Sequence, residues 1–222
     1  MNIKYILIFL IIFILNPGFE SQKKDKKSEE TTPYQEYLIL LREYRKSCRT
    51  ALKPFRYDGA LTTHFSYKDY DYSKEVEIAT IQNQTYRLSF NANGIIGEGI
   101  KIKIFDKPKK FRSRTLLYEK ENVTASEFIV ETDIMIEELK KAKNIELESN
   151  TELSDEERTY QKSIIEKLRV KKLYIDYIIP ASERVFEEDE EGNEKRVITK
   201  AAIILAVGYN NIYHQISSKK FF

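Results

Sequence analysis

The sequence predicts a mainly β protein: a jelly-roll-like β-sandwich with an N-terminal helix and a two-helix insertion. Apolar residues recur every three or four positions only near the N-terminus and between residues 133 and 169. Most of the remaining chain alternates apolar and polar residues, in short segments separated by turn residues. Many short alternating strands are typical of sandwiches and jelly rolls. An open α+β sheet packed against the helices is the alternative.

The first residues predict an export signal over residues 1–21. Lys4 precedes an uncharged apolar run from Tyr5 to Leu15, and Pro17 follows it. A cation, a short apolar run and a helix breaker, in that order, are typical of a secretory signal. The run is also shorter than the ~20 residues of a transmembrane helix. We therefore expect an exported chain, in the periplasm or at the outer membrane or cell surface, with an uncleaved membrane anchor as the alternative.

The composition narrows the classes of function. Lys and Arg number 37 against 35 Asp and Glu, for a net charge of +2. Nucleic-acid binding requires a basic excess on one face, so we expect no nucleic-acid partner. Cys48 is the only cysteine, so no intramolecular disulfide can form and the fold depends on its hydrophobic core.

A polar tether and a helix are expected to precede the sandwich. Residues 22–32 contain Lys, Glu, Ser and Thr without an apolar residue, which predicts a disordered tether. Residues 33–54 predict a helix with one apolar stripe that includes Leu41, Cys48 and Leu52. The stripe packs either on the sandwich or on a partner.

The sandwich domain is expected over residues 55–213, followed by a tail at 214–222. Its clearest strand is Ile100 to Ile104, where apolar and charged residues alternate. Ala201 to Val207 is continuously apolar, which predicts a strand buried on both faces. A helical insertion is predicted over residues 133–169.

Three strand segments resemble the pre-peptidase C-terminal β-sandwich family: Tyr86 to Phe90, Ile100 to Asp106 and Leu173 to Tyr177. The resemblance covers roughly residues 74–208 and implies an accessory, non-catalytic role in binding or secretion. The whole chain also resembles uncharacterised exported proteins of Gram-negative bacteria. Lys101 and the helical insertion depart from the family pattern.

The residue types offer little for catalysis. His64 and His214 are the only histidines, and Cys48 lies on an apolar helix stripe, where a thiol is usually a core residue. Asp69 and Asp71 follow His64, but such residues are more often solvated surface than metal ligands. We therefore predict no catalytic residue, no metal site and no cofactor, with a hydrolase based on two carboxylates as the weaker alternative.

Two short segments are candidate binding sites. Tyr67, Tyr70 and Tyr72, interspersed with charged residues, suit contact with a protein or glycan, although rings packed over the sandwich edge are the favoured interpretation. A second segment is basic and suits an anionic surface, or is a solvated loop; its candidate residues are Lys109, Lys110 and Arg112.

These observations predict an exported, non-catalytic binding or structural protein, expected as an accessory subunit of a cell-envelope assembly. A soluble glycan-binding module is the alternative. The expected partner is an envelope protein or a polysaccharide, and such a partner or an uncleaved signal would also associate the chain with a membrane. The sequence leaves the oligomeric state open.

Overall fold

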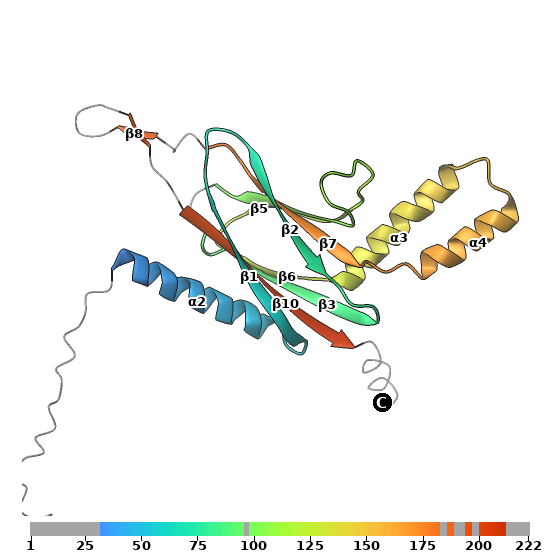
Figure 1. Ribbon diagram of the computed structural model, residues 1–222, viewed down its shortest axis with the longest axis horizontal. Coiled ribbons are helices and arrows are strands. Elements are labelled where there is room, and N and C mark those ends of the chain that lie inside the picture. Colours follow the sequence, from blue (N-terminus) through green and yellow to red (C-terminus); the bar gives the residue numbers. More distant parts are fainter. Residues whose placement is uncertain (1–31, 96–97, 183–185, 189–193, 197–199, 212–222) are drawn as a thin grey trace, which may run out of the picture. The chain divides into compact units, whose positions relative to one another are not determined.

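The computed structural model describes residues 32–95, 98–182, 186–188, 194–196 and 200–211 (Figure 1). The predicted signal, nearly all of the predicted tether, His214 and the predicted tail lie outside the described residues. The chain divides into two compact units, Met1–Glu36 and Tyr37–Phe222. The fold and sites below belong to the second unit.

Eight strands form two antiparallel four-stranded sheets. The first sheet has the order β1 (Arg56–Ser66), β10 (Lys200–Asn211), β3 (Gln84–Asn91) and β6 (Glu127–Glu131). The second has the order β2 (Tyr72–Ala79), β7 (Lys172–Ile179), β4 (Ile100–Phe105) and β5 (Leu116–Val123). A short hairpin of β8 (Phe186–Glu188) and β9 (Glu194–Arg196) falls between β7 and β10 in the chain.

The strand pairing identifies the topology. Leaving the short hairpin aside, the first strand pairs with the last, the second with the second-last, the third with the sixth, and the fourth with the fifth. This nested pairing is an antiparallel ribbon wound into two packed sheets, which is a jelly roll. The fold prediction is therefore confirmed, and the open α+β sheet is not the architecture.

The core lies between the two sheets and follows from the alternation in the sequence. In β4, Ile100, Ile102 and Ile104 are fully buried. The lysines between them point outward, and Lys103 pairs with Glu119 of β5 at 3.1 Å. Period-two alternation therefore places one face in the core and one in contact with water.

From Tyr37 on, helix α2 (Pro33–Ala51) covers the outer face of the first sheet. Leu41, Cys48 and Leu52 pack against the outward side chains of β10, including Ile204. The inward residues of β10 lie in the main core, so the strand is buried on both faces as predicted. The helix ends three residues earlier than predicted, because a residue that precedes proline, here Lys53, disfavours the helical conformation. Its stripe packs on the domain.

The helical insertion consists of α3 (Thr132–Ser149) and α4 (Asp155–Glu166), here called the arm. Met135 and Leu139 anchor the first half of α3 in the core between the sheets. Ser154 caps α4 in a reciprocal capping box with Glu157, as the sequence spacing indicates. The arm therefore has a buried base and a more exposed distal part (Figure 1).

Candidate functional site

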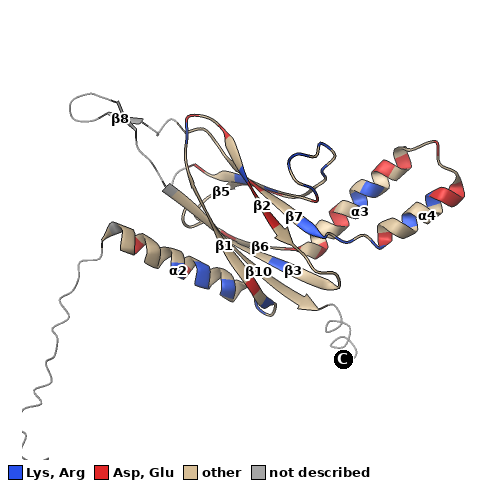
Figure 2. Ribbon diagram, viewed as in Figure 1, with Lys and Arg blue, Asp and Glu red and all other residues tan. Residues whose placement is uncertain are grey.

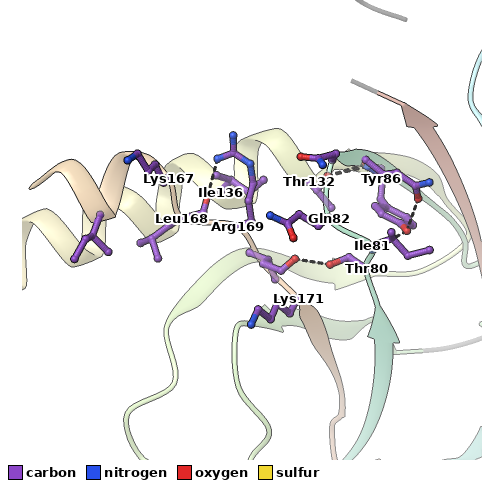
Figure 3. Close-up of a pocket in the computed structure, with 14 residues that line it drawn as sticks. Thr80, Ile81, Gln82, Tyr86, Thr132, Ile136, Lys167, Leu168, Arg169 and Lys171 are labelled. Atoms are coloured by element: carbon purple, nitrogen blue, oxygen red, sulfur yellow. Dashed lines mark hydrogen bonds between the residues drawn. The ribbon is translucent and has the colours of Figure 1, made fainter. Parts of the chain in front are cut away.

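A pocket of about 440 Å³ lies at the base of the arm (Figure 3). Four segments form it: the β2–β3 turn at 80–84, the first turns of α3, the end of α4, and residues 167–171, which lead into β7. These segments meet because α3 begins where β6 ends, while the chain returns from α4 into the other sheet. The volume lies within the range of about 300–1,000 Å³ of small-molecule sites.

Aliphatic side chains make up most of the pocket wall. They come from every segment that lines it: Ile81, Ile136, Ile164, Leu168 and Val170. Ile81 and Ile164 are exposed although they are large and apolar. Because moving exposed aliphatic side chains out of water lowers the free energy, this wall favours an apolar ligand.

Hydrogen bonds fix the position of the β2–β3 turn. The Tyr86 hydroxyl accepts the backbone N–H of Ile81 at 2.9 Å and donates to the Gln84 side chain at 2.8 Å. The Thr80 hydroxyl donates to the carbonyl of Val170, which joins the turn to the segment after α4. Figure 3 draws these bonds as dashed lines. These bonds hold the β2–β3 turn against β3 and against the segment that follows α4.

Three cationic side chains line the same pocket: Lys167, Arg169 and Lys171. None of the lining residues is Asp or Glu. The nearby Asp133 has a raised pKa, caused first by burial and then by Glu131, and Arg169 opposes that rise. The Gln82 side chain points toward Arg169 (Figure 3). The pocket therefore combines apolar walls with a positive charge.

A second hollow, of about 280 Å³, lies along the same segment. It shares Arg169 and Lys171 with the pocket and adds Lys107 and Lys172. Asp106 is the one acidic residue that lines it. Cations therefore surround the segment that joins the arm to β7.

The far end of the arm has the opposite charge. Residues 144–160, here called the tip, contain six acidic residues and one basic residue. Figure 2 shows acidic residues gathered at the start of α4. Two large apolar side chains accompany them: Ile145 is 61 % exposed and Tyr160 is 65 % exposed.

The predicted tyrosine cluster divides into buried and exposed members. Tyr67 is buried, and its hydroxyl donates to the carbonyl of Glu98. Tyr72 is half-buried and packs against the core. Tyr70 is 53 % exposed, and the Lys68 ammonium lies 4.8 Å from its ring centroid. Of the three tyrosines, Tyr70 therefore offers the most surface, and binding there stays a prediction.

The predicted basic residues lie in the β4–β5 loop, which contacts β2. The Lys109 backbone N–H donates to Glu75 and its ammonium donates to Ser73, both at 2.6 Å. Lys110 and Arg112 are exposed. Lys109 therefore holds the loop in place, and the other two face solvent beside it.

The residues considered for catalysis have structural contacts. Burial raises the pKa of the Cys48 thiol to about 11, which disfavours the reactive thiolate. The His64 ring nitrogen lies 3.2 Å from the Tyr37 hydroxyl, and Asp71 accepts the backbone N–H of Ala181. Within the described ranges, no group of three or more His, Cys, Asp or Glu side chains is arranged to hold a metal ion.

Sequence reasoning did not find the pocket. Its lining residues belong to segments far apart in the chain, and no pattern predicts that a β2–β3 turn meets the end of α4. One local signal was present: Lys167 to Lys172 contains four basic residues between a helix and a strand. The excess of acidic residues at the tip could also be recognised from the sequence.

No protein-family model matches the chain, and no curated protein matches it either. The resemblance to pre-peptidase C-terminal domains therefore stays a prediction. Of the helices that the structure describes, none combines the length and the hydropathy of a membrane span.

Proposed function

We propose that this chain is an exported, non-catalytic binding protein, an accessory subunit of a cell-envelope assembly that docks through the tip of the arm. The partner is a protein with a basic surface and an apolar pocket. The observation that carries the proposal is the tip itself, which places Ile145 and Tyr160 in solvent among acidic residues.

The tip has the features of a docking surface. A tyrosine ring offers apolar area and a hydroxyl at low entropic cost, and tyrosine is enriched among the residues that contribute most to binding. Glu148, Glu152 and Asp155 are exposed on the same tip. Their charge steers a basic partner and disfavours an acidic one.

The tip is also held in place, which reduces the entropic cost of binding. One guanidinium bridges the turn between the helices: Arg158 donates to the carbonyls of Leu147 at 3.2 Å and Asn150 at 3.0 Å. The capping box of α4 fixes the same turn. Met135 then anchors α3 in the core at the other end.

The proposed location of the protein in the cell envelope is supported by its N-terminal sequence. Lys4, the apolar run and Pro17 support export, and the polar residues 22–32 support a tether. A tethered domain with a projecting arm suits an accessory subunit of an envelope assembly. The resemblance to pre-peptidase C-terminal domains supports the same non-catalytic role.

The alternative of a hydrolase based on two carboxylates needs both of them in one cleft. The pocket at the base of the arm is lined by no carboxylate, the second hollow by Asp106, and a hollow between α3 and α4 by Glu146. These linings support binding over hydrolysis.

Photo-crosslinking in the native host tests the proposal. A photoreactive residue is placed at Ile145 or Tyr160, with Leu116 and Ile129 as exposed apolar control positions on strands. We expect one envelope protein to crosslink at both tip positions and at neither control, and the yield to fall with added salt. Equal crosslinking at all four positions, or none at the tip, would reject docking through the arm.

Glycan binding at Tyr70 is the second candidate, favoured by its exposed ring and by Lys68, which lies over it. Its test is retention on polysaccharide. Tyr70→Ala should abolish retention, while Tyr57→Ala should not, although Tyr57 is also an exposed tyrosine with a cation, Arg49, over its ring.

A further inference from the structure

The pocket at the base of the arm is lined by both aliphatic and cationic side chains, and docking through the tip involves neither set. Its walls are aliphatic, and its charged lining residues are all cations. We infer that it binds a small amphiphile with an aliphatic body and one anionic head group, a carboxylate or a phosphate monoester.

The aliphatic wall of the pocket matches an aliphatic body in the ligand. Ile81, Ile164 and Leu168 come from three separate segments and line one pocket, and the first two are exposed. An aliphatic chain would remove this surface from water, which is favourable in proportion to the area buried. The single aromatic ring of the lining, Tyr86, is buried, so no aromatic face is offered to a sugar.

The cationic side chains that line the pocket match an anionic head group in the ligand. Lys167, Arg169 and Lys171 line the pocket, and the Arg169 guanidinium donates to the carbonyl of Leu168 at 2.7 Å. The first turn of α3, at Thr132, also lines the pocket and brings the positive end of the helix dipole. Glu131 and Asp133 are acidic groups near the start of α3: Glu131 pairs with Arg87 at 2.5 Å, and burial raises the pKa of Asp133, so this carboxyl stays protonated to a higher pH than a free aspartate.

The charged residues around the pocket also limit the alternatives. A cationic amphiphile would meet three like charges, and a neutral one would gain no electrostatic attraction from them. A free inorganic anion would gain nothing from the aliphatic wall. The two-part lining therefore selects for both parts of the ligand together.

Calorimetry on the full domain with dodecanoate, dodecyl phosphate, dodecanol and inorganic phosphate tests the inference, each amphiphile below its micelle concentration. We expect saturable binding of either or both anionic amphiphiles, and binding of dodecanol weaker by about tenfold or more. Inorganic phosphate alone should not bind measurably. The stronger of the two anions identifies the head group. Equal binding of dodecanol, or no binding of either anionic amphiphile, would overturn the inference.

A matched pair of variants locates the binding. Lys167→Gln, Arg169→Gln and Lys171→Gln together should weaken binding by about tenfold or more. The control removes the same charge from exposed residues elsewhere, through Arg42→Gln, Lys46→Gln and Lys53→Gln, and should change the affinity by less than about twofold. An equal effect of the two triple variants would mean non-specific attraction and would reject the site.

Isoleucine methyl spectra supply a readout independent of affinity. The methyl signals of Ile81, Ile136 and Ile164 should shift on addition of the anionic amphiphile, while those of Ile39 and Ile129, exposed elsewhere, should not. Shifts confined to Ile39 or Ile129 would place the ligand outside the pocket and contradict the inference.

Discussion

Arg114 donates from Nη1 to Asp176 Oδ2 at 2.8 Å, and the Asp176 side chain is only 3 % exposed. The other oxygen of Asp176 has no hydrogen-bond partner among the described residues. The Arg114 guanidinium also lies 3.7 Å from the ring centroid of Phe105. Arg114 therefore ties the end of the β4–β5 loop to the outer face of the second sheet and neutralises its buried carboxylate.

Removing the arginine should leave a buried charge without a partner. Arg114→Ala is expected to lower the free energy of unfolding by about 3 kcal/mol, measured by urea denaturation. Arg112→Ala, two residues away and exposed, should change it by less than about 0.5 kcal/mol. Combining Arg114→Met with Asp176→Leu should recover most of the loss. A double variant no more stable than Arg114→Ala would contradict this role of the pair.

Two leucines, Leu40 on α2 and Leu52 just after it, test whether this segment packs on the domain. Leu52→Ala removes a fully buried side chain just after the helix and should cost about 2–4 kcal/mol. Leu40→Ala removes the same atoms from an exposed position of the helix and should cost less than about 0.5 kcal/mol. Similar small losses from both, in thermal or urea unfolding, would mean that α2 does not contribute to the fold.

Two glycines differ in the space around them. A Cβ at Gly94 would lie 2.6 Å from the carbonyl oxygen of Ala202, whereas a Cβ at Gly59 would meet nothing within 4 Å. Gly94→Ala should therefore destabilise the protein by about 1–3 kcal/mol, because backbone must move. Gly59→Ala should be close to neutral. The melting temperatures of the two variants give the comparison, and equal melting temperatures would contradict the close approach.

The Cys48 thiol predicts a pH dependence. Its pKa rises from 9.0 to about 11 in the folded chain because of burial. Between these values the unfolded thiol ionises first, so the unfolded state binds fewer protons and stability falls as the pH rises. The loss reaches about 2–3 kcal/mol over this window. Because Tyr67 also has a raised pKa, the comparison with Cys48→Ala isolates the thiol, and parallel pH curves for the two proteins would refute the prediction.

The fold was predictable because local patterns and the global topology agree. Ile100 to Ile104 fixes one strand by alternation, Ala201 to Val207 fixes a strand covered on both faces, and Ser154 with Glu157 fixes the start of α4. What covers the outer face of β10 was not predictable. The apolar stripe of α2 suits a partner as well as the domain.

The candidate site was less predictable, for a physical reason. Tyr67, Tyr70 and Tyr72 stand in one polar segment, yet Tyr67 is buried just after β1, Tyr72 packs against the core and Tyr70 is exposed. Ile81 and Arg169 line one pocket although they lie far apart in the chain. Tertiary contacts decide such sites, and a single sequence carries no record of those contacts.

The most direct test of docking through the arm is to purify the tagged chain from the native host. The quantity measured is the stoichiometry of any envelope protein that is purified with it. We compare Tyr160→Ala with Tyr70→Ala, two exposed tyrosines on different surfaces. The account predicts an envelope protein recovered in constant proportion with the unmodified chain and with Tyr70→Ala, and lost with Tyr160→Ala. Recovery of the unmodified chain alone, or loss of the partner with Tyr70→Ala and not with Tyr160→Ala, would contradict docking through the arm.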